Sequence, residues 1–296
     1  MRILIAVMFS LAAQAAWAAS ALNVVATTAS MGMLAREVGG AAMQVTVLAA
    51  PDRDPHMLQA KPSMMRALRD ADLVVAVGAE LEMGWLPAAI NGAANPRLLP
   101  GRDGYFEAAA QVSLLDSGQA ADRAHGDVHP TGNPHVNLDP VRMAAIARAL
   151  AERMAKLEPA QAATFRAGAQ RFAAAAEQRV PGWQAQAAGS PGGVLFHKDG
   201  NYLFALLGLP ILGYVEPVPG VPPSASHLNN LTAKLKGQRG VILHHAYQPA
   251  QGPQLLASRL GWKTAVVPLE PAKDADAAAY FQLIDTWVAA LVAAKG

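Results

Sequence analysis

The sequence predicts an α/β protein made of two lobes. Short apolar and β-branched runs alternate with helical patterns in the first half of the chain, which is typical of a parallel sheet flanked by helices. A long helical pattern covers residues 159–188, and the alternation of strands and helices restarts after it, at Gly193. We therefore expect two parallel-rich sheets flanked by helices and joined by one long helix.

The first eighteen residues are typical of a secretory signal peptide. Arg2 supplies the positive charge, residues 3–13 form an apolar core, and Ala16-Trp17-Ala18 is an A-x-A cleavage site. The apolar core is too short to span a bilayer. We expect the mature chain to be exported to the periplasm.

Composition narrows the classes of protein to consider. The formal net charge is +2, and no basic run with interleaved aromatic residues is present, so nucleic acid is not an expected partner. The chain contains no cysteine, which excludes disulfides and thiolate ligands, and we also expect no cysteine-linked lipid anchor. Hydrophobic residues make up 52% of the chain, and its length favours two modest domains over a single large one.

In the first lobe, short apolar runs predict strands and helical spacing predicts the segments between them. The expected strands cover residues 22–27, 45–49 and 72–77, and the expected helices residues 30–38 and 62–70. Residues 96–127 are rich in Gly, Pro and Asp and predict a loop, with a short strand near residues 111–115. Asp139 followed by Pro140 is an N-cap signal for a helix over residues 141–154.

The long helix over residues 159–188 is rich in Ala and Gln, and Pro181 is expected to kink it or to end its first part. In the second lobe the expected strands are residues 193–196, 211–215, 240–244 and 264–268, and the expected helices 202–207, 226–235, 254–260 and 277–294. The predicted division is a signal peptide (1–18), an N-terminal lobe (19–156), a connecting helix (157–190) and a C-terminal lobe (191–296).

Three histidines occupy similar structural positions. His56 lies in a loop after a predicted strand, His197 directly follows another, and His135 lies in a proline-stiffened loop ahead of a helix. Loops at the carboxyl ends of strands form the binding crevice of open α/β sheets. If the two lobes face each other, the three imidazoles meet there as a zinc-like ligand set. Any one of them alone is more simply a structural residue.

Other polar residues near these histidines have two interpretations. Asp54 could orient the ring of His56, or it could simply form a turn before the next proline. His125 and His129 could help to capture metal, although a solvated loop is the simpler interpretation. His245, at the end of a strand in the second lobe, is a candidate for a fourth ligand.

Three stretches together resemble the signatures of one family. They are residues 54–82 (DPHMLQAKPSMMRALRDADLVVAVGAELE), 132–140 (GNPHVNLDP) and 196–228 (FHKDGNYLFALLGLPILGYVEPVPGVPPSASHL). In order and spacing they are similar to the metal-binding subunits of ABC importers for zinc and manganese, the cluster A-I (ZnuA/TroA-like) solute-binding proteins. The resemblance extends over nearly the whole mature chain. It implies two α/β lobes joined by one long helix, with the metal in the interlobe cleft and His56, His135 and His197 as ligands.

The chain departs from the family pattern at the fourth ligand. Family members often place an Asp or Glu near the start of the loop after the last strand, where this chain has Leu269 as the matching residue. Glu270 or Asp274 could serve if the loop adjusts, His245 could take the place, or water could complete the shell.

The resemblance implies a periplasmic receptor, not an enzyme, that captures a divalent cation and delivers it to an ABC permease in the inner membrane. We expect it to act as a monomer. Three imidazoles favour Zn²⁺ over Mn²⁺, because Mn²⁺ prefers oxygen ligands, although a carboxylate from Glu270 would weaken that preference. One alternative is a zinc-dependent hydrolase that uses the three histidines and a bound water, with Glu80 or Glu270 as general base. A metal-free adhesin or scaffold is a third interpretation.

Overall fold

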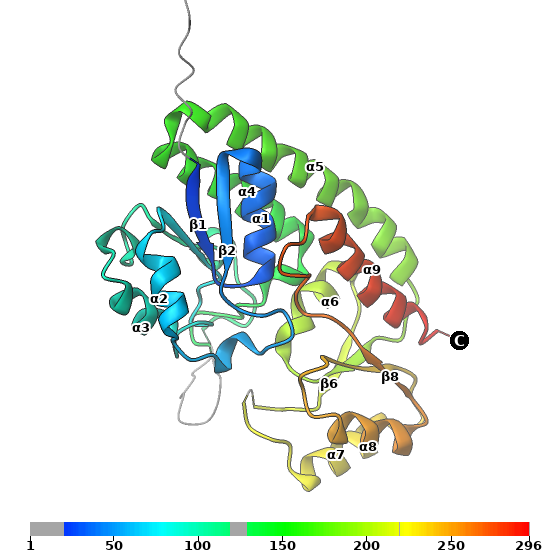
Figure 1. Ribbon diagram of the computed structural model, residues 1–296. Coiled ribbons are helices and arrows are strands. Elements are labelled where there is room, and N and C mark those ends of the chain that lie inside the picture. Colours follow the sequence, from blue (N-terminus) through cyan, green and yellow to red (C-terminus); the bar gives the residue numbers. More distant parts are fainter. Residues whose placement is uncertain (1–20, 119–128, 219, 296) are drawn as a thin grey trace, which may run out of the picture.

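The computed structural model describes residues 21–118, 129–218 and 220–295, so the expected signal peptide lies outside the described residues. Each of the two lobes contains a four-stranded parallel sheet (Figure 1). The strand order is β2-β1-β3-β4 in the first sheet and β6-β5-β7-β8 in the second. This repeated order confirms the predicted α/β class with two parallel sheets. Within the described residues, no helix combines the length and the apolar character needed to cross a bilayer.

The first lobe places helices on both faces of its sheet. Its strands are β1 (Leu22–Ala26), β2 (Met43–Val47), β3 (Leu73–Ala76) and β4 (Tyr105–Glu107). Its helices are α1 (Ala29–Gly39), α2 (Pro62–Arg69), α3 (Leu86–Ala93) and α4 (Pro140–Leu157). Along β1, Val24 and Ala26 enter the core that contains residues of α1 and α4, whereas Val25 enters the core formed with α2 and α3. Because successive side chains of a strand point to opposite faces of the sheet, β1 contributes to the hydrophobic core on each face.

The second lobe repeats the arrangement. Its strands are β5 (Gly193–Leu195), β6 (Ile211–Tyr214), β7 (Val241–His244) and β8 (Lys263–Val266). Its helices are α6 (Asn201–Leu207), α7 (Ala225–Leu235), α8 (Gln251–Leu260) and α9 (Ala277–Val292). Along β7, Ile242 enters the core formed with α7 and α8, while Val241 and Leu243 enter the core that includes residues of α6 and α9. All the strands and helices expected in this lobe are present.

The expectations for residues 78–118 are partly wrong. No strand forms at 111–115; the fourth strand is β4, which pairs with β3 from Tyr105 to Glu107. A three-residue strand is too short to give a periodic pattern, and its place is decided by pairing with β3. Helix α3 was not expected at all. Glu82, after β3, is buried and accepts hydrogen bonds from Thr27 Oγ1 and from the backbone of Val77 and Gly78.

The long helix α5 (Ala162–Ala187) runs along both lobes (Figure 1). It continues past Pro181, so of the two effects expected of this proline, a kink or an end to the first part of the helix, the second is wrong. Gly168 lets α5 lie against the end of α1. A Cβ atom at this position would be 2.4 Å from the carbonyl oxygen of Val38, and backbone cannot move aside as a flexible side chain can.

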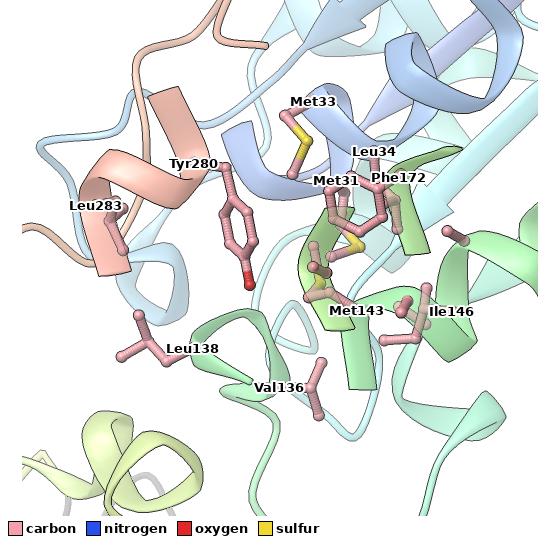
Figure 2. Close-up of a cluster of buried hydrophobic side chains, with 14 of the residues drawn as sticks. Met31, Met33, Leu34, Val136, Leu138, Met143, Ile146, Phe172, Tyr280 and Leu283 are labelled. Atoms are coloured by element: carbon pink, nitrogen blue, oxygen red, sulfur yellow. The ribbon is translucent and has the colours of Figure 1, made fainter. Parts of the chain in front are cut away.

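The main core extends across the two lobes. Helix α9 follows the second sheet in the sequence, yet it packs against α1 and α5. Figure 2 shows Tyr280 of α9 beside Met33 of α1, and Leu283 of α9 above Leu138. The hydroxyl of Tyr280 donates a hydrogen bond to the carbonyl oxygen of Asn137, 2.8 Å away. This packing places the loop that carries His135 against the last helix.

Candidate metal centre

The structure brings His56, His135 and His197 together. One ring nitrogen of each residue lies within 4.8 Å of the others. The ring centroid of His135 is 5.2 Å from that of His56 and 5.2 Å from that of His197, and the remaining centroid distance is 5.7 Å. The three residues come from separate loops in both lobes. The sequence predicts each of them at the end of an element, and the fold brings these ends together.

Short 3₁₀ turns hold the three rings in position. His56 lies inside the turn Pro55–Met57, which follows β2, with Asp54 as its N-cap. His135 and His197 are the residues directly before the turns Val136–Leu138 and Lys198–Gly200. These compact turns fix the backbone, so little backbone entropy remains to be lost when the rings bind a ligand.

Each of the three rings donates its Nδ1 proton to a nearby side-chain oxygen. The distances from Nδ1 to the acceptor are 2.7 Å for Asp54 Oδ1, 2.8 Å for Asn133 Oδ1 and 3.3 Å for Glu216 Oε1. A histidine that donates from Nδ1 keeps the lone pair on Nε2, which is the arrangement found in metal ligands. Asp54 also accepts from the backbone N–H of His56 at 2.9 Å. It therefore both orients the ring of His56 and forms the turn before it.

Two of these rings are buried, and burial disfavours a proton on the ring of His135. His135 is 4% exposed, and burial together with the neighbouring His197 and His56 lowers its pKa well below the usual value. His197 is 7% exposed, and its buried Nε2 has no hydrogen-bond partner in the described part of the chain. Buried nitrogens normally have a hydrogen-bond partner. An Nε2 without one, beside other imidazoles, fits a role as one of several nitrogen ligands of a Zn²⁺ ion.

Asn133 links the two lobes at this centre. Its Oδ1 orients His135, while its Nδ2 donates to the carbonyl oxygen of Lys198, which directly follows His197. The distance of that second hydrogen bond is 2.8 Å. One amide side chain therefore fixes a ring from the first lobe and the backbone next to a ring from the second.

His129 lies closer to the centre than the sequence indicated. It is half-buried rather than solvated, and its Nε2 is 3.1 Å from Nε2 of His56. Its ring centroid is 6.3 Å from that of His135. The Pro- and Gly-rich loop around it gives no periodic signal, so the sequence shows only that a histidine is present. His125 lies outside the described residues.

His245 does not join the group of imidazoles. Its Nε2 and Nδ1 are each 2.7 Å from an oxygen, Oδ2 of Asp199 and the carbonyl oxygen of Val267 respectively. Both side chains are buried, and although burial opposes the charged forms, their attraction lowers the pKa of Asp199 and raises that of His245. The pair joins the loops that follow β5 and β7, and neither ring nitrogen of His245 remains for a metal.

Glu270 also lies outside the group. It reaches the N-terminus of α1, where its carboxylate accepts from the backbone N–H of Ser30 and from Asn137 Nδ2 at 3.3 Å. The carbonyl oxygen of the preceding residue, Leu269, accepts from the same amide at 2.8 Å. A carboxylate is favoured at a helix N-terminus. Glu270 thus holds the second lobe against the first behind the histidines.

Replacing Glu270 with Gln is expected to change how stability depends on pH. Burial raises the pKa of Glu270 to about 7, above its usual 4.5, so between these values the folded chain binds a proton that the unfolded chain lacks. The free energy of unfolding of the wild type therefore decreases as pH rises through this range, by at most about 3 kcal/mol from this group. Urea unfolding of both metal-free proteins at about pH 5 and pH 8 measures the difference.

The stability of Glu270→Gln relative to the wild type should therefore increase from the acidic to the basic condition. Both proteins carry the same histidines, whose own titration cancels in the comparison. A difference in stability that stays constant with pH would contradict the raised pKa.

A family model matches this chain over residues 24–294, and its description is "Zinc-uptake complex component A periplasmic". Among curated proteins, the zinc-binding lipoprotein AdcA of Streptococcus pneumoniae is 25% identical over 266 residues, which is 86% of this chain and 51% of that protein. The chain therefore spans about half the length of this relative. The high-affinity zinc uptake system protein ZnuA of Yersinia pestis is 26% identical over 235 residues and 74% of each chain.

Solved structures show the same fold. The solute-binding protein FpvC of Pseudomonas aeruginosa, in complex with Mn²⁺, has a TM-score of 0.77 at 21% identity, covering 93% of this chain and 98% of its own. A zinc-bound deletion mutant of ZnuA has a TM-score of 0.75 at 19% identity, covering 92% and 98%. At these identities the likeness establishes the two-lobed architecture.

Proposed function

We propose a function from one premise, which is that the chain belongs to the ZnuA family of periplasmic zinc-uptake components. It acts as the periplasmic receptor of an ABC importer, capturing a divalent cation between its lobes and delivering it to the membrane permease. The ligands are His56, His135 and His197, and the cation is Zn²⁺ rather than Mn²⁺. The metal is cargo, and no bond is broken.

The observation that carries this proposal is the common orientation of the three rings. Each donates from Nδ1 to an oxygen, which leaves three Nε2 lone pairs for one ion. The oxygen acceptors raise the basicity of the rings and fix their tautomers, as they do in known metal sites. A structural cluster of histidines would need no such shared arrangement.

The choice of metal follows from the donor atoms. Nitrogen ligands suit Zn²⁺, whereas Mn²⁺ prefers carboxylate, carbonyl and water oxygens. The carboxylate of Glu270 binds the N-terminus of α1 and so does not supply the oxygen ligand that would favour Mn²⁺. His129, beside His56, is positioned to supply a fourth nitrogen from its loop.

Metal content and competitive titration test the proposal. The mature protein, stripped with EDTA, should bind one Zn²⁺ per chain, and Mn²⁺ should displace it only at a large excess. If neither ion binds tightly, this receptor function is wrong. If Mn²⁺ competes on equal terms, the assignment of Zn²⁺ is wrong and an oxygen ligand has to be present.

Zinc affinity is expected to fall as pH falls. Imidazole binds metal only when it is neutral, so protons compete with the ion at each ring. The lowered pKa of His135 keeps this ring neutral under more acidic conditions than an ordinary histidine. Titration against a zinc chelator of known affinity, from about pH 7 down to about pH 5, should show a steady increase in Kd. A Kd that does not change over this range would contradict a three-histidine site.

Neither carboxylate that was expected as the general base of a zinc hydrolase joins the three histidines. Glu270 is bound at the N-terminus of α1, and Glu80 lines a different hollow, with Met83, Tyr105 and Thr131. A base has to lie within hydrogen-bond reach of the water that it activates. The family of uptake components to which the chain belongs also favours a receptor.

A further inference from the structure

A cavity of about 850 Å³ opens beside the histidine centre. His197 lines it directly, and so does Asp54, the carboxylate that binds the ring of His56. Its other walls come from both lobes, including Met57 and Lys61 of the first and Tyr247 of the second. Cavities of roughly 300–1,000 Å³ are typical of sites for small organic molecules, and a metal ion with a few waters fills only a small part of such a space.

The charges around the cavity suit an anion with several oxygens. Arg53 and Lys61 line it, and in the described part of the chain neither side chain makes a hydrogen bond or an ion pair. The carboxylates on its walls balance these cations only while no metal is bound. Asp199 pairs with His245, whereas Asp54 and Glu216 accept from neutral rings and keep their charges. Arg53 and Lys61 offset those two carboxylates, so a bound divalent ion adds two positive charges that an external anion can balance.

The histidine centre itself also favours an external anion. Three neutral imidazoles bring no charge of their own to balance a divalent ion in a partly buried site, which is costly unless anions are near. Among the described residues no carboxylate joins the three ring nitrogens, and Asp54 and Glu216 bind the Nδ1 side of two rings. Zn²⁺ accepts four or sometimes five ligands, so the three imidazoles leave at least one position for a further ligand.

We propose that the centre takes its metal together with a small polycarboxylate chelator. This proposal rests on the receptor function proposed above. One carboxylate of the chelator coordinates the ion from the cavity side, next to His197, and a second lies against Arg53 and Lys61. The cargo is then a ternary complex in which the three rings replace water on a metal that is still held by its chelator.

The test uses zinc and citrate, a tricarboxylate, as probes. Equilibrium dialysis with radiolabelled citrate measures whether citrate is retained by the zinc-loaded protein and by the metal-free protein. The variant Arg53→Gln/Lys61→Gln removes the two cations, and Arg171→Gln/Lys236→Gln removes two exposed cations elsewhere as a control matched in charge. Zinc affinity without citrate is measured for all three proteins.

Citrate should be retained at one per bound Zn²⁺ by the wild type and the control, and not without zinc. The Arg53→Gln/Lys61→Gln variant should bind citrate about tenfold more weakly, with its affinity for free Zn²⁺ unchanged. If citrate is not retained and only withdraws zinc from all three proteins equally, the chelate proposal is wrong while the metal receptor stands. If free Zn²⁺ does not bind to the wild type, the receptor function itself fails.

Discussion

Replacing His135 with alanine is expected to weaken Zn²⁺ binding by roughly 100- to 1,000-fold while leaving the fold intact. Structural zinc sites with four ligands bind with about 10–16 kcal/mol, so one ligand contributes about 3–4 kcal/mol. His135 is the central ring of the three, 5.2 Å by centroid from each of the others. Competition with a zinc chelator at about pH 7 measures the change in affinity.

His227→Ala is the matched control. The ring of this histidine donates from Nε2 to the carbonyl oxygen of Tyr214, away from the three rings, so zinc affinity should not change. Circular dichroism and thermal unfolding of the metal-free proteins check that both variants fold. Unchanged affinity in a folded His135→Ala protein would mean that the loop from Gly132 to Pro140 has a structural role only.

Replacing Asp199 with alanine is expected to lower the free energy of unfolding by about 3–5 kcal/mol. The side chains of Asp199 and His245 are 4% and 2% exposed, and 2.7 Å separates their paired atoms. Removing one member leaves the other buried without its partner, which costs far more than a lost surface pair. Total stabilities are about 5–15 kcal/mol, so the loss should be plain in urea unfolding of the metal-free protein.

Glu177→Ala provides the comparison, because Glu177 pairs with Arg148 where both side chains are nearly half exposed. Pairs of this kind contribute little, so this variant should unfold close to the wild type. A loss for Asp199→Ala no larger than that for Glu177→Ala would contradict the structural role of the buried pair. His245 would then be available as a ligand again.

The amino-acid sequence was sufficient for the local features of the fold. Short apolar runs located the strands of the second sheet, and the Asp139-Pro140 signal located the start of α4, where Asp139 accepts from two backbone N–H groups. These features depend on residues close in sequence, so their signals are local. The same is true of the position of each histidine at the end of an element.

Other features depend on contacts between residues far apart in the chain. Strand β4 exists because it pairs with β3, and Glu270 is directed to α1 because an unpaired N–H of Ser30 lies there, 240 positions earlier. His245 is occupied by Asp199 for the same kind of reason. The sequence therefore identified three imidazoles and the chemistry that they share. The folded chain decided which side chains surround them, because burial and partner choice are properties of packing between lobes and leave no local pattern.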